Sequence, residues 1–275
     1  MKVDSKERDQ ALAHTIKTLG NMEFSEAFAN FVRQIIDFDN LIILAYHCEE
    51  SPAVLYREYN DPIVFSSMDS EYLNGAYLLD PYYRAHLNGP KTGLHRLIDV
   101  APDQFKRTSY FNVYYQKTTL IDEIAAFANI SPDVTITACI GKDRSSGICF
   151  PKKDVKALRG YEKAISALLE EHWKNYLPDR VSSTSLLPLI NRLRTELEKE
   201  MGVRLSPRQA QVAMFVLRGH SSISIGLNLG ISPETVKVFR RQLYAKCNIS
   251  SQAELFAMIM PMFSRLSGTR NYDAT

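Results

Sequence analysis

The sequence predicts two domains of different fold class, an α/β domain in residues 1–177 and an all-helical domain in residues 201–265. In the first part, runs with strand periodicity alternate with helical stretches. In the second part, helix-start and helix-stop signals follow one another closely without strand runs. The two parts also differ in charge, because residues 1–177 hold 20 Lys and Arg against 24 Asp and Glu, while residues 200–265 hold eight against three. The net charge of +2 therefore combines an acidic domain with a basic one.

Length and composition limit the possible classes of protein. With 275 residues and 45% apolar side chains, the chain is long enough for two domains with separate cores. The longest strongly apolar run, residues 41–46, is too short to span a membrane, and residues 1–7 contain no apolar signal-peptide core. We therefore expect a cytoplasmic protein that has no membrane partner.

The cysteine and histidine residues show no metal-ligand pattern. The four cysteines contain no CxxC pair, and the six histidines are scattered. We expect neither a metal nor a cofactor, and we interpret the cysteines as small buried hydrophobic residues in a reducing compartment. These cysteines are Cys48, Cys139, Cys149 and Cys247.

In the first domain, hairpins and flanking helices without βαβ crossovers favour an antiparallel sheet covered by helices, a sandwich of the PAS/GAF type. The predicted elements are helices over 6–19 and 24–37, strands over 41–46 and 53–59, a helical stretch over 67–88 interrupted near Asp80-Pro81, an extended piece near 95–98, a helical stretch over 103–116, a hairpin of strands over 120–130 and 134–141, a last strand over 148–150 and a helix over 152–176.

Residues 178–200 are predicted to link the domains. They begin polar and become helical from Leu186, and residues 266–275 are expected to form a flexible tail. Two interpretations of the linker helix remain open, a short dimer seam and packing on one of the domains. The apolar repeat of this helix is shorter than two heptads, which favours packing on one of the domains. The apolar positions concerned are Leu186, Ile190, Leu193 and Leu197.

The second domain contains four predicted helices. The first begins at Ser206-Pro207, with Gln209 as the capping-box partner, and ends at Gly219. A second helix over 222–229 ends at Gly230, which permits a tight turn. A third begins at Ser232-Pro233 and a fourth after Ser251, where Glu254 completes a capping box. Val236, Phe239 and Leu243 form the apolar stripe of the third helix, opposite Thr235, Lys237, Val238, Arg241 and Gln242.

This basic third helix in a four-helix unit has the geometry that places side chains into a DNA major groove. Residues 203–262 resemble the LuxR-type (LuxR/FixJ) helix-turn-helix. The motif positions are Ser206-Pro207-Arg208-Gln209-Ala210-Gln211-Val212, then Ile231, Ser232, Thr235, Val236 and Lys237, and finally Lys246 through Leu255.

The resemblance implies a DNA-contact set in which Lys237, Val238 and Arg241 face the bases. Thr235 and Arg240 would contact phosphates or brace the helix, and Ser232 belongs to the same set. The last helix would pair two DNA-binding domains. Because glutamines replace both acids of the opening motif, neutral hydrogen bonds must replace any ion pairs that these acids form in the family.

Tyrosines point to a ligand pocket in the first domain. Ten of the 14 tyrosines lie between Tyr46 and Tyr115. Tyrosine combines an apolar ring with a hydroxyl, which suits a pocket for a small, partly polar ligand. Some of these rings are equally expected as ordinary core or surface residues. The tyrosines predicted to bind ligand are Tyr59, Tyr72, Tyr77 and Tyr83.

Asp80 is the best polar candidate in that pocket. The Tyr77-x-x-Asp80-Pro81 segment resembles the stretch that supplies an aspartate to the ligand amide in acyl-homoserine-lactone sensors. Those sensors also use tryptophans there, whereas Trp173 lies in the last helix of the domain, so another small metabolite is favoured. Alternatively, Asp80 only caps the following helix. Arg57, Asp122 and Glu123 are further candidate anchors.

These patterns predict a transcriptional regulator that binds double-stranded DNA as a homodimer and responds to a small-molecule effector. The alternatives are an acyl-homoserine-lactone receptor and a phosphorylation-controlled response regulator, which would require a parallel βα repeat. The sequence has no GxSxG motif and no phosphate-binding glycine loop, so it does not indicate an enzyme. Residues 141–147, which contain two glycines, are better explained as a hairpin turn than as a phosphate site.

Overall fold

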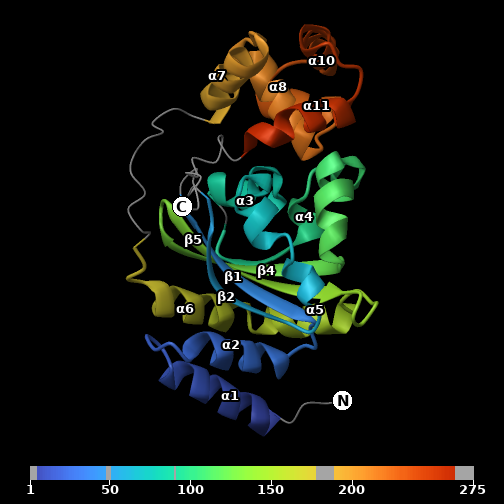
Figure 1. The fold of residues 1–275 in the computed structure, drawn as a ribbon. Coiled ribbons are helices and arrows are strands. Elements are labelled where there is room, and N and C mark those ends of the chain that lie inside the picture. Colours follow the sequence, from blue (N-terminus) through green and yellow to red (C-terminus); the bar gives the residue numbers. More distant parts are fainter. Residues whose placement is uncertain (1–4, 48–50, 90, 178–188, 264–275) are drawn as a thin grey trace, which may run out of the picture.

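The computed structural model of the protein describes residues 5–47, 51–89, 91–177 and 189–263. It shows the expected architecture, an antiparallel sheet with helices followed by a C-terminal helical domain (Figure 1). In Figure 1 the sheet lies in the middle of the molecule, with α1, α2 and α6 on one side and the C-terminal helices beyond the other. Among the described residues, no helix combines the length and apolar character needed to cross a bilayer.

The sheet has five strands in the order β2-β1-β5-β4-β3, and all neighbouring strands are antiparallel. The predicted hairpin around Ser131-Pro132-Asp133 is confirmed as β4 and β5. Because every strand pair is antiparallel, the sheet is not the parallel sheet of a phosphorylated receiver domain. The strands are β1 (Asn40–His47), β2 (Ala53–Tyr59), β3 (Gly93–Arg96), β4 (Leu120–Ser131) and β5 (Val134–Asp143).

One face of the sheet is covered by long helices and forms an aliphatic and phenylalanine core. The helix α2 contributes Phe24, Phe28 and Phe31, none of which has any exposed surface. The Thr15 hydroxyl donates to the Ala27 carbonyl at 3.0 Å and so ties α1 to α2. These helices are α1 (Ser5–Lys17), α2 (Phe24–Arg33), α5 (Lys152–Gly160) and α6 (Glu162–Trp173).

The opposite face is covered by short helical turns. The interruption predicted near Asp80-Pro81 is present, but the stretches predicted over 67–88 and 103–116 are divided further than expected. Gly75 (φ +124°) and Pro81 interrupt the first stretch. The turns are η1 (Pro62–Phe65), η3 (Ala76–Leu79), η4 (Phe105–Arg107) and η6 (Tyr115–Thr118) in the 3-10 conformation, η2 (Met68–Tyr72) and η5 (Tyr110–Tyr114) in the π conformation, and the α-helices α3 (Pro81–Leu87) and α4 (Leu97–Val100).

Three other predictions for this domain are corrected. The helix predicted over 152–176 is two helices, α5 and α6, with a break at Tyr161 (ψ 4°), where the Glu162 carboxylate accepts from the Leu94 amide at 2.7 Å. The strand predicted over 148–150 does not form, because the Phe150 amide donates to the Asp122 carboxylate instead of to a neighbouring strand. The piece near 95–98 is extended only to Arg96, and α4 follows it.

A buried polar network explains the turn after β5. The Asp39 carboxylate accepts from the Asp143 amide at 2.8 Å and pairs with Lys142 at 3.2 Å. Asn40 donates to the Asp143 carboxylate at 2.7 Å. The polar groups of this network form hydrogen bonds and ion pairs with one another. Residues 141–147 are therefore the end of β5 and a turn, as the sequence predicts.

The C-terminal domain confirms the predicted caps except the box at Ser251, where the Glu254 carboxylate accepts from the Ser250 amide instead of the Ser251 amide. Ser206 and Gln209 form a complete capping box, and Gly219 (φ +92°) and Gly230 (φ +64°) end their helices in the left-handed conformation. The helices are α7 (Leu189–Met201), α8 (Pro207–Arg218), α9 (Ser222–Leu229), α10 (Pro233–Cys247) and α11 (Gln252–Ile259), followed by the 3-10 turn η7 (Met260–Met262).

The linker helix α7 packs on α8, so the structure favours packing over a dimer seam. Leu189, Leu193 and Leu197 are buried, while Leu186 lies outside the described residues. Cys139 is buried and Cys247 half-buried. Cys149 is exposed, contrary to the expectation, because the segment that carries it is not a strand.

Candidate DNA-binding face and ligand site

The helix α10 presents the predicted basic face. Its apolar stripe is anchored by Val236 and Leu243, which have no exposed surface. Thr235, Lys237 and Arg241 are exposed on the other side, and Val238 is 38% exposed beside them. This side borders an open hollow of about 510 Å³, lined by Lys237, Arg240, Arg241, Tyr244, Ala245, Ile249 and Ser250.

Two members of the predicted DNA-contact set hold the helix itself. The Ser232 hydroxyl caps α10 by accepting from the Thr235 amide at 3.1 Å. The Arg240 guanidinium lies over the Tyr244 ring, 5.9 Å from its centre, and reaches the Ser222 hydroxyl of α9 at 3.5 Å. Arg240 thus braces α10 against α9, one of the two roles expected for it.

The glutamine that replaces the first acid of the opening motif forms one neutral hydrogen bond, as expected, and one hydrogen bond with a lysine. The Gln209 side chain donates to Gln242 at 3.1 Å and accepts from Lys246 at 3.0 Å. Lys246 also donates to the Arg204 carbonyl at 2.8 Å. These bonds fasten α10 to the start of α8 without a carboxylate.

In the N-terminal domain, tyrosines gather on one face of the sheet and form what we call the tyrosine layer. Within it, the Tyr72 hydroxyl donates to the Asp80 carboxylate at 2.6 Å and lies 3.0 Å from the Tyr46 hydroxyl. Seven of these rings are at most 4% exposed, and that of Tyr115 is 8% exposed. The layer consists of Tyr46, Tyr72, Tyr77, Tyr82, Tyr83, Tyr110, Tyr114 and Tyr115.

Asp80 is the helix cap that the alternative interpretation expected, and its carboxylate also lies within the tyrosine layer. It caps α3 by accepting from the Tyr82 amide at 2.7 Å, and the same carboxylate accepts from Tyr72 inside the layer. Burial raises the pKa of Asp80 to about 6, although the hydrogen bonds that it accepts act in the opposite direction. A carboxylate that loses hydration inside an aromatic layer is a strong polar anchor for a ligand.

The other predicted ligand residues divide into two groups. Tyr77 and Tyr83 join Asp80 in the layer, with ring centres 4.7 Å apart. Tyr59 and Arg57 lie outside it, on β2. Tyr59 is 46% exposed, and Arg57 forms a surface ion pair with Asp69 at 3.2 Å. Both residues lie outside the layer because β2 is the edge strand of the sheet. The alternation of residues along a strand does not show whether that strand is at the edge.

Glu123, the last-named of the further candidate anchors, is a buried residue of the sheet. It lies on β4 opposite Gly141 and is 9% exposed. Burial, and secondarily the negative charge of Asp80, raises the pKa of Glu123 to about 8. The available signal was the alternation Glu123, Ala125, Phe127, which places Glu123 on the same face as two buried apolar residues.

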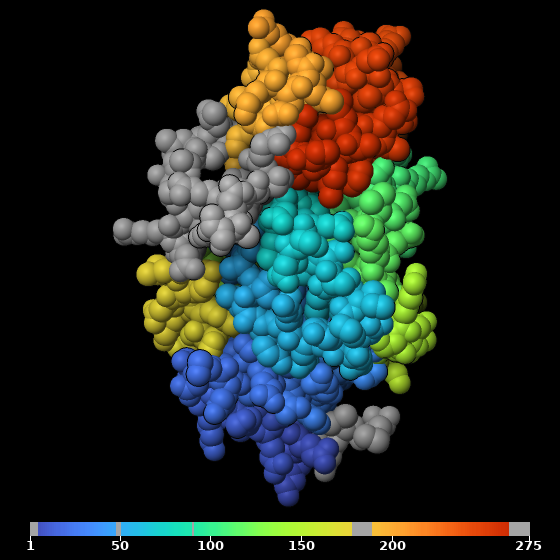
Figure 2. All heavy atoms as spheres, viewed as in Figure 1, coloured from blue at the N-terminus to red at the C-terminus, as the bar shows by residue number. Residues whose placement is uncertain are grey.

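The DNA-binding domain sits directly on the elements that carry the tyrosine layer, as Figure 2 shows for one side of the molecule. The Arg218 guanidinium at the end of α8 donates to the Leu78 carbonyl of η3 at 3.1 Å. The Gln104 amide donates to the Gly219 carbonyl at 2.9 Å, and the Ser221 amide donates to the Asp103 carboxylate at 3.0 Å. We call these three hydrogen bonds the docking contact.

Close packing and charge accompany the docking contact. A Cβ at Gly219 would lie 2.9 Å from the Phe105 Cα, and one at Gly75 would lie 2.6 Å from the Phe263 backbone. Burial, and then the positive charges of Arg218 and Arg84, lower the pKa of His220 to about 4. The apolar core of the tyrosine layer is continuous with the core of the DNA-binding domain.

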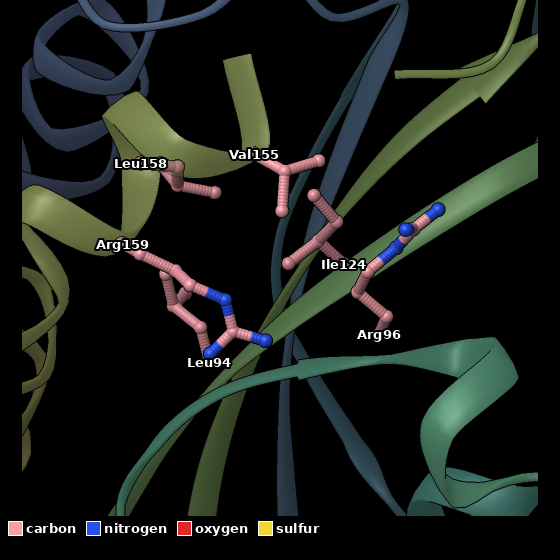
Figure 3. Close-up of a pocket in the computed structure, with 6 residues that line it drawn as sticks. All are labelled: Leu94, Arg96, Ile124, Val155, Leu158 and Arg159. Atoms are coloured by element: carbon pink, nitrogen blue, oxygen red, sulfur yellow. The ribbon is translucent and has the colours of Figure 1, made fainter. Parts of the chain in front are cut away.

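A recess on the other face of the sheet does not suit a ligand. It lies between α5 and strands β3 and β4 and has about 170 Å³ between its atoms, with no space for a water molecule (Figure 3). Arg96 at its edge is paired with Asp122 at 3.1 Å. The residues lining it are Leu94, Arg96, Ile124, Val155, Leu158 and Arg159.

Comparison with known proteins agrees with this two-part arrangement. Residues 203–259 match the family described as bacterial regulatory proteins of the luxR family. The chain is 28% identical over 186 residues to a protein named as an HTH-type transcriptional regulator in the exeN 3′ region of Aeromonas salmonicida, which covers 66% of this chain and 93% of that protein.

Solved structures are also similar. The crystal structure of the VqsR LBD domain from Pseudomonas aeruginosa has a TM-score of 0.50 and 21% identity, covering 60% of this chain and 94% of that one. The crystal structure of Escherichia coli SdiA has a TM-score of 0.43 and 13% identity, and the match covers 94% of this chain and 97% of the SdiA chain.

The basic face of α10, the family match over residues 203–259 and the Aeromonas salmonicida relative indicate a transcriptional regulator with a helix-turn-helix domain. Residues 203–259 form a DNA-binding domain of the LuxR family, as the motifs predicted. The N-terminal domain has the fold of the VqsR LBD domain.

Proposed function

We propose that this chain is a ligand-controlled transcriptional regulator that binds promoter DNA as a homodimer. The exposed basic face of α10 carries the proposal, because Lys237, Val238 and Arg241 project from a helix that is capped, braced and anchored from behind. Two such helices, one from each protomer, would occupy adjacent major grooves of a pseudo-palindromic site. Thr235 and the helix start at Ser232 lie where phosphate contacts are made.

The effector site is the tyrosine layer around Asp80. A small molecule there would lie between the sheet and the short turns η2, η3 and η5, in a PAS/GAF-like sandwich. The name of the VqsR LBD domain, which shares this fold, supports a ligand-binding role. An acyl-homoserine lactone is the less favoured effector, because Trp173 belongs to the core on the opposite face of the sheet.

Control of DNA binding runs through the docking contact. The Leu78 carbonyl that accepts from Arg218 is two residues before Asp80, so one short turn touches both the effector site and the DNA-binding domain. A ligand shifts such an equilibrium only by binding the docked and released arrangements with different affinity. Movement of η3 when the ligand binds makes the affinity of the ligand differ between the docked and the released arrangement.

The central test is removal of the two exposed cations of α10. The double substitution Lys237→Ala/Arg241→Ala is expected to weaken binding to the upstream region of the regulator's own operon by about 100-fold or more, since each base contact supplies about 1–3 kcal/mol. Fluorescence anisotropy with labelled DNA measures the affinity, and circular dichroism verifies the fold.

A matched control removes the same charge elsewhere. Lys163 is exposed on α6 and Lys174 is exposed directly after its end, on the far side of the sheet, and Lys163→Ala/Lys174→Ala is expected to bind DNA like the parent protein. Equal losses in both double variants, or unchanged binding by the α10 variant, would contradict the assignment of the DNA-binding face.

The ligand site has its own test. Asp80→Asn preserves a helix-capping side chain but removes the charge. Thermal stabilisation of the full-length protein by a molecule found in a metabolite screen should be lost in this variant. Stabilisation that survives both Asp80→Asn and Tyr77→Phe would place the effector elsewhere.

A further inference from the structure

The tyrosine layer holds two acidic side chains and no compensating cation. In the described ranges 5–47, 51–89, 91–177 and 189–263, no Lys or Arg forms an ion pair with Asp80 or Glu123. Burying a carboxylate without a partner is costly, and proteins normally pair such groups. The carboxyl groups of Asp80 and Glu123 therefore have no cation of the described chain beside them, and burial raises the pKa of both.

The basic residues nearest in the strand ladder point to the other face. Lys142 is opposite Asp122, one position from the Glu123–Gly141 pair, and it is bound by Asp37 and Asp39 at 2.6 and 3.2 Å. Arg96 is bound by Asp122. Since adjacent strand residues alternate between faces, neither cation can turn toward Glu123 without leaving its partners.

Glu123 differs from Asp80 in having no hydrogen-bond partner for its carboxyl group within the described part of the chain. Only its backbone is engaged, through the Tyr82 hydroxyl, which donates to the Glu123 carbonyl at 3.1 Å. The buried Tyr115 hydroxyl also has no hydrogen-bond partner among the described residues. Tyr115 is in η6, which packs against β4, the strand that carries Glu123. A buried hydroxyl without a partner and a carboxyl group without a hydrogen bond, on the same face of the sheet, indicate a site whose ligand would satisfy them.

The aromatic surroundings favour the same class of ligand. Tyr72 stacks on Tyr114 with ring centres 6.0 Å apart, and Tyr110 stacks on Tyr114 at 5.3 Å. The electron-rich faces of tyrosine rings attract organic cations, and this attraction strengthens where water is excluded. Carboxylates supply the directional hydrogen bonds that the rings lack.

We propose that the effector is an organic cation, a small amine or guanidine, whose charged group binds between Glu123 and Asp80 while its carbon skeleton lies among the rings of the tyrosine layer. The proposal rests on the proposed function and specifies its ligand. It gives Glu123 the role of a specificity-determining residue, which selects for positive charge and against neutral lactones and anionic acids.

The proposal is tested with probes of one shape and different charge. Tyramine, tyrosol and 4-hydroxyphenylacetate share a phenol ring and end in an ammonium, a hydroxyl and a carboxylate. Agmatine and choline extend the cationic set. Calorimetric titration of the full-length protein is expected to give tyramine a Kd at least about tenfold below that of tyrosol, with no binding of the acid, because a charge-assisted bond adds about 1.4 kcal/mol or more. Tighter binding of agmatine or choline than of either uncharged or acidic phenol supports the proposal equally.

The variant Glu123→Gln distinguishes an anchor from a structural residue. It should remove the preference for the cation, so that tyramine and tyrosol bind alike. In the ligand-free protein it should raise Tm at pH 8.5 and change Tm little at pH 4, where Glu123 is protonated in both the folded and the unfolded chain. Glu171→Gln, an exposed carboxylate on α6, is the control and should change neither Tm nor binding.

Two outcomes would overturn the proposal. One is tighter binding of tyrosol, 4-hydroxyphenylacetate or octanoyl-homoserine lactone than of every cation, which would leave ligand control intact but exclude a cationic effector. The other is failure of all three cations to bind together with a lower Tm for Glu123→Gln at pH 8.5, which would make Glu123 structural. DNA binding by the protein and its loss in Lys237→Ala/Arg241→Ala are independent of both outcomes.

Discussion

The two faces of the sheet contrast sharply in chemistry although they share the same five strands. The face toward α2 and α6 is packed with phenylalanine and aliphatic side chains, among them Phe28, Ile136 and Leu169, none with exposed surface. The face toward η2, η3 and η5 is packed with tyrosines, two acidic residues and a hydroxyl without a partner. Only this second face continues into the DNA-binding domain.

The difference separates stability from function. Close-packed apolar surface stabilises the fold without directional requirements. Buried acids and tyrosine hydroxyls destabilise the ligand-free protein, and they persist where a ligand or a moving contact needs them. The long helices thus hold the sheet, and the short turns on the other face are free to serve binding and communication.

The largest effect is expected on the stabilising face. Phe28→Ala should lower the free energy of unfolding by about 3–5 kcal/mol, because a buried ring is replaced by a cavity. Urea denaturation followed by circular dichroism measures the change. Met22→Ala, at a fully exposed position between α1 and α2, is the control and should change little. The DNA affinity of the folded fraction should be unaffected, and a specific loss of DNA affinity would break the proposed division between the faces.

A smaller effect is expected at the docking contact. Gly219→Ala should cost about 2–4 kcal/mol, of which roughly 1–2 kcal/mol is left-handed strain and the rest is contact with Phe105 and Thr108. Gly202→Ala carries the same strain (φ +68°) with open space around the new methyl group and is the matched control.

Calorimetry sharpens that comparison. If Gly219→Ala separates the domains, its unfolding should split into two transitions, whereas Gly202→Ala should retain the pattern of the parent protein. If both variants unfold in a single transition and their Tm values fall by the same amount, the docking contact does not couple the domains.

The smallest effect is expected within the tyrosine layer. Tyr72→Phe removes the hydrogen bond that lowers the pKa of Asp80, so that pKa should rise above its value of about 6. Because a raised folded-state pKa means that stability is lost as pH rises through it, the variant should lose more stability at pH 8 than at pH 5. The loss at pH 8 should be about 1.5–3 kcal/mol, typical of a hydrogen bond to a charged group.

Tyr114→Phe is the control for this substitution. The Tyr114 ring packs against Tyr72, and its hydroxyl donates no hydrogen bond to any described residue. Its cost in unfolding free energy should be small at both pH values. Equal pH dependence in the two variants would show that the Tyr72–Asp80 hydrogen bond does not control the ionisation of Asp80.

The C-terminal domain was predictable in detail because its determinants are local. Ser206, Gly219 and Ser232 mark helix ends through hydrogen bonds and backbone conformations that depend on neighbouring residues. The strands β1 and β2 and the β4–β5 hairpin were predictable for the same reason, since alternation and the turn at Ser131-Pro132-Asp133 are short-range signals.

The errors lie where distant contacts override local preference. The helix predicted over 152–176 breaks because Glu162 binds the backbone of β3, 68 residues away. The helical stretches over 67–88 and 103–116 divide into short turns that follow the tyrosine layer. Of the six predicted ligand residues, the structure collects Tyr72, Tyr77, Tyr83 and Asp80, and it separates Tyr59 and Arg57, because their strand is at the sheet edge.

The sequence by itself determined the LuxR-family DNA-binding domain, its basic helix and the class of the first domain, because caps, periodicity and charge are written in adjacent residues. Only the tertiary structure decided that Glu123 is buried opposite Gly141 without a cation, and that Arg218 reaches the turn before Asp80. Burial and partners depend on which distant segments meet, and chain folding alone brings residues 140 positions apart within a hydrogen bond.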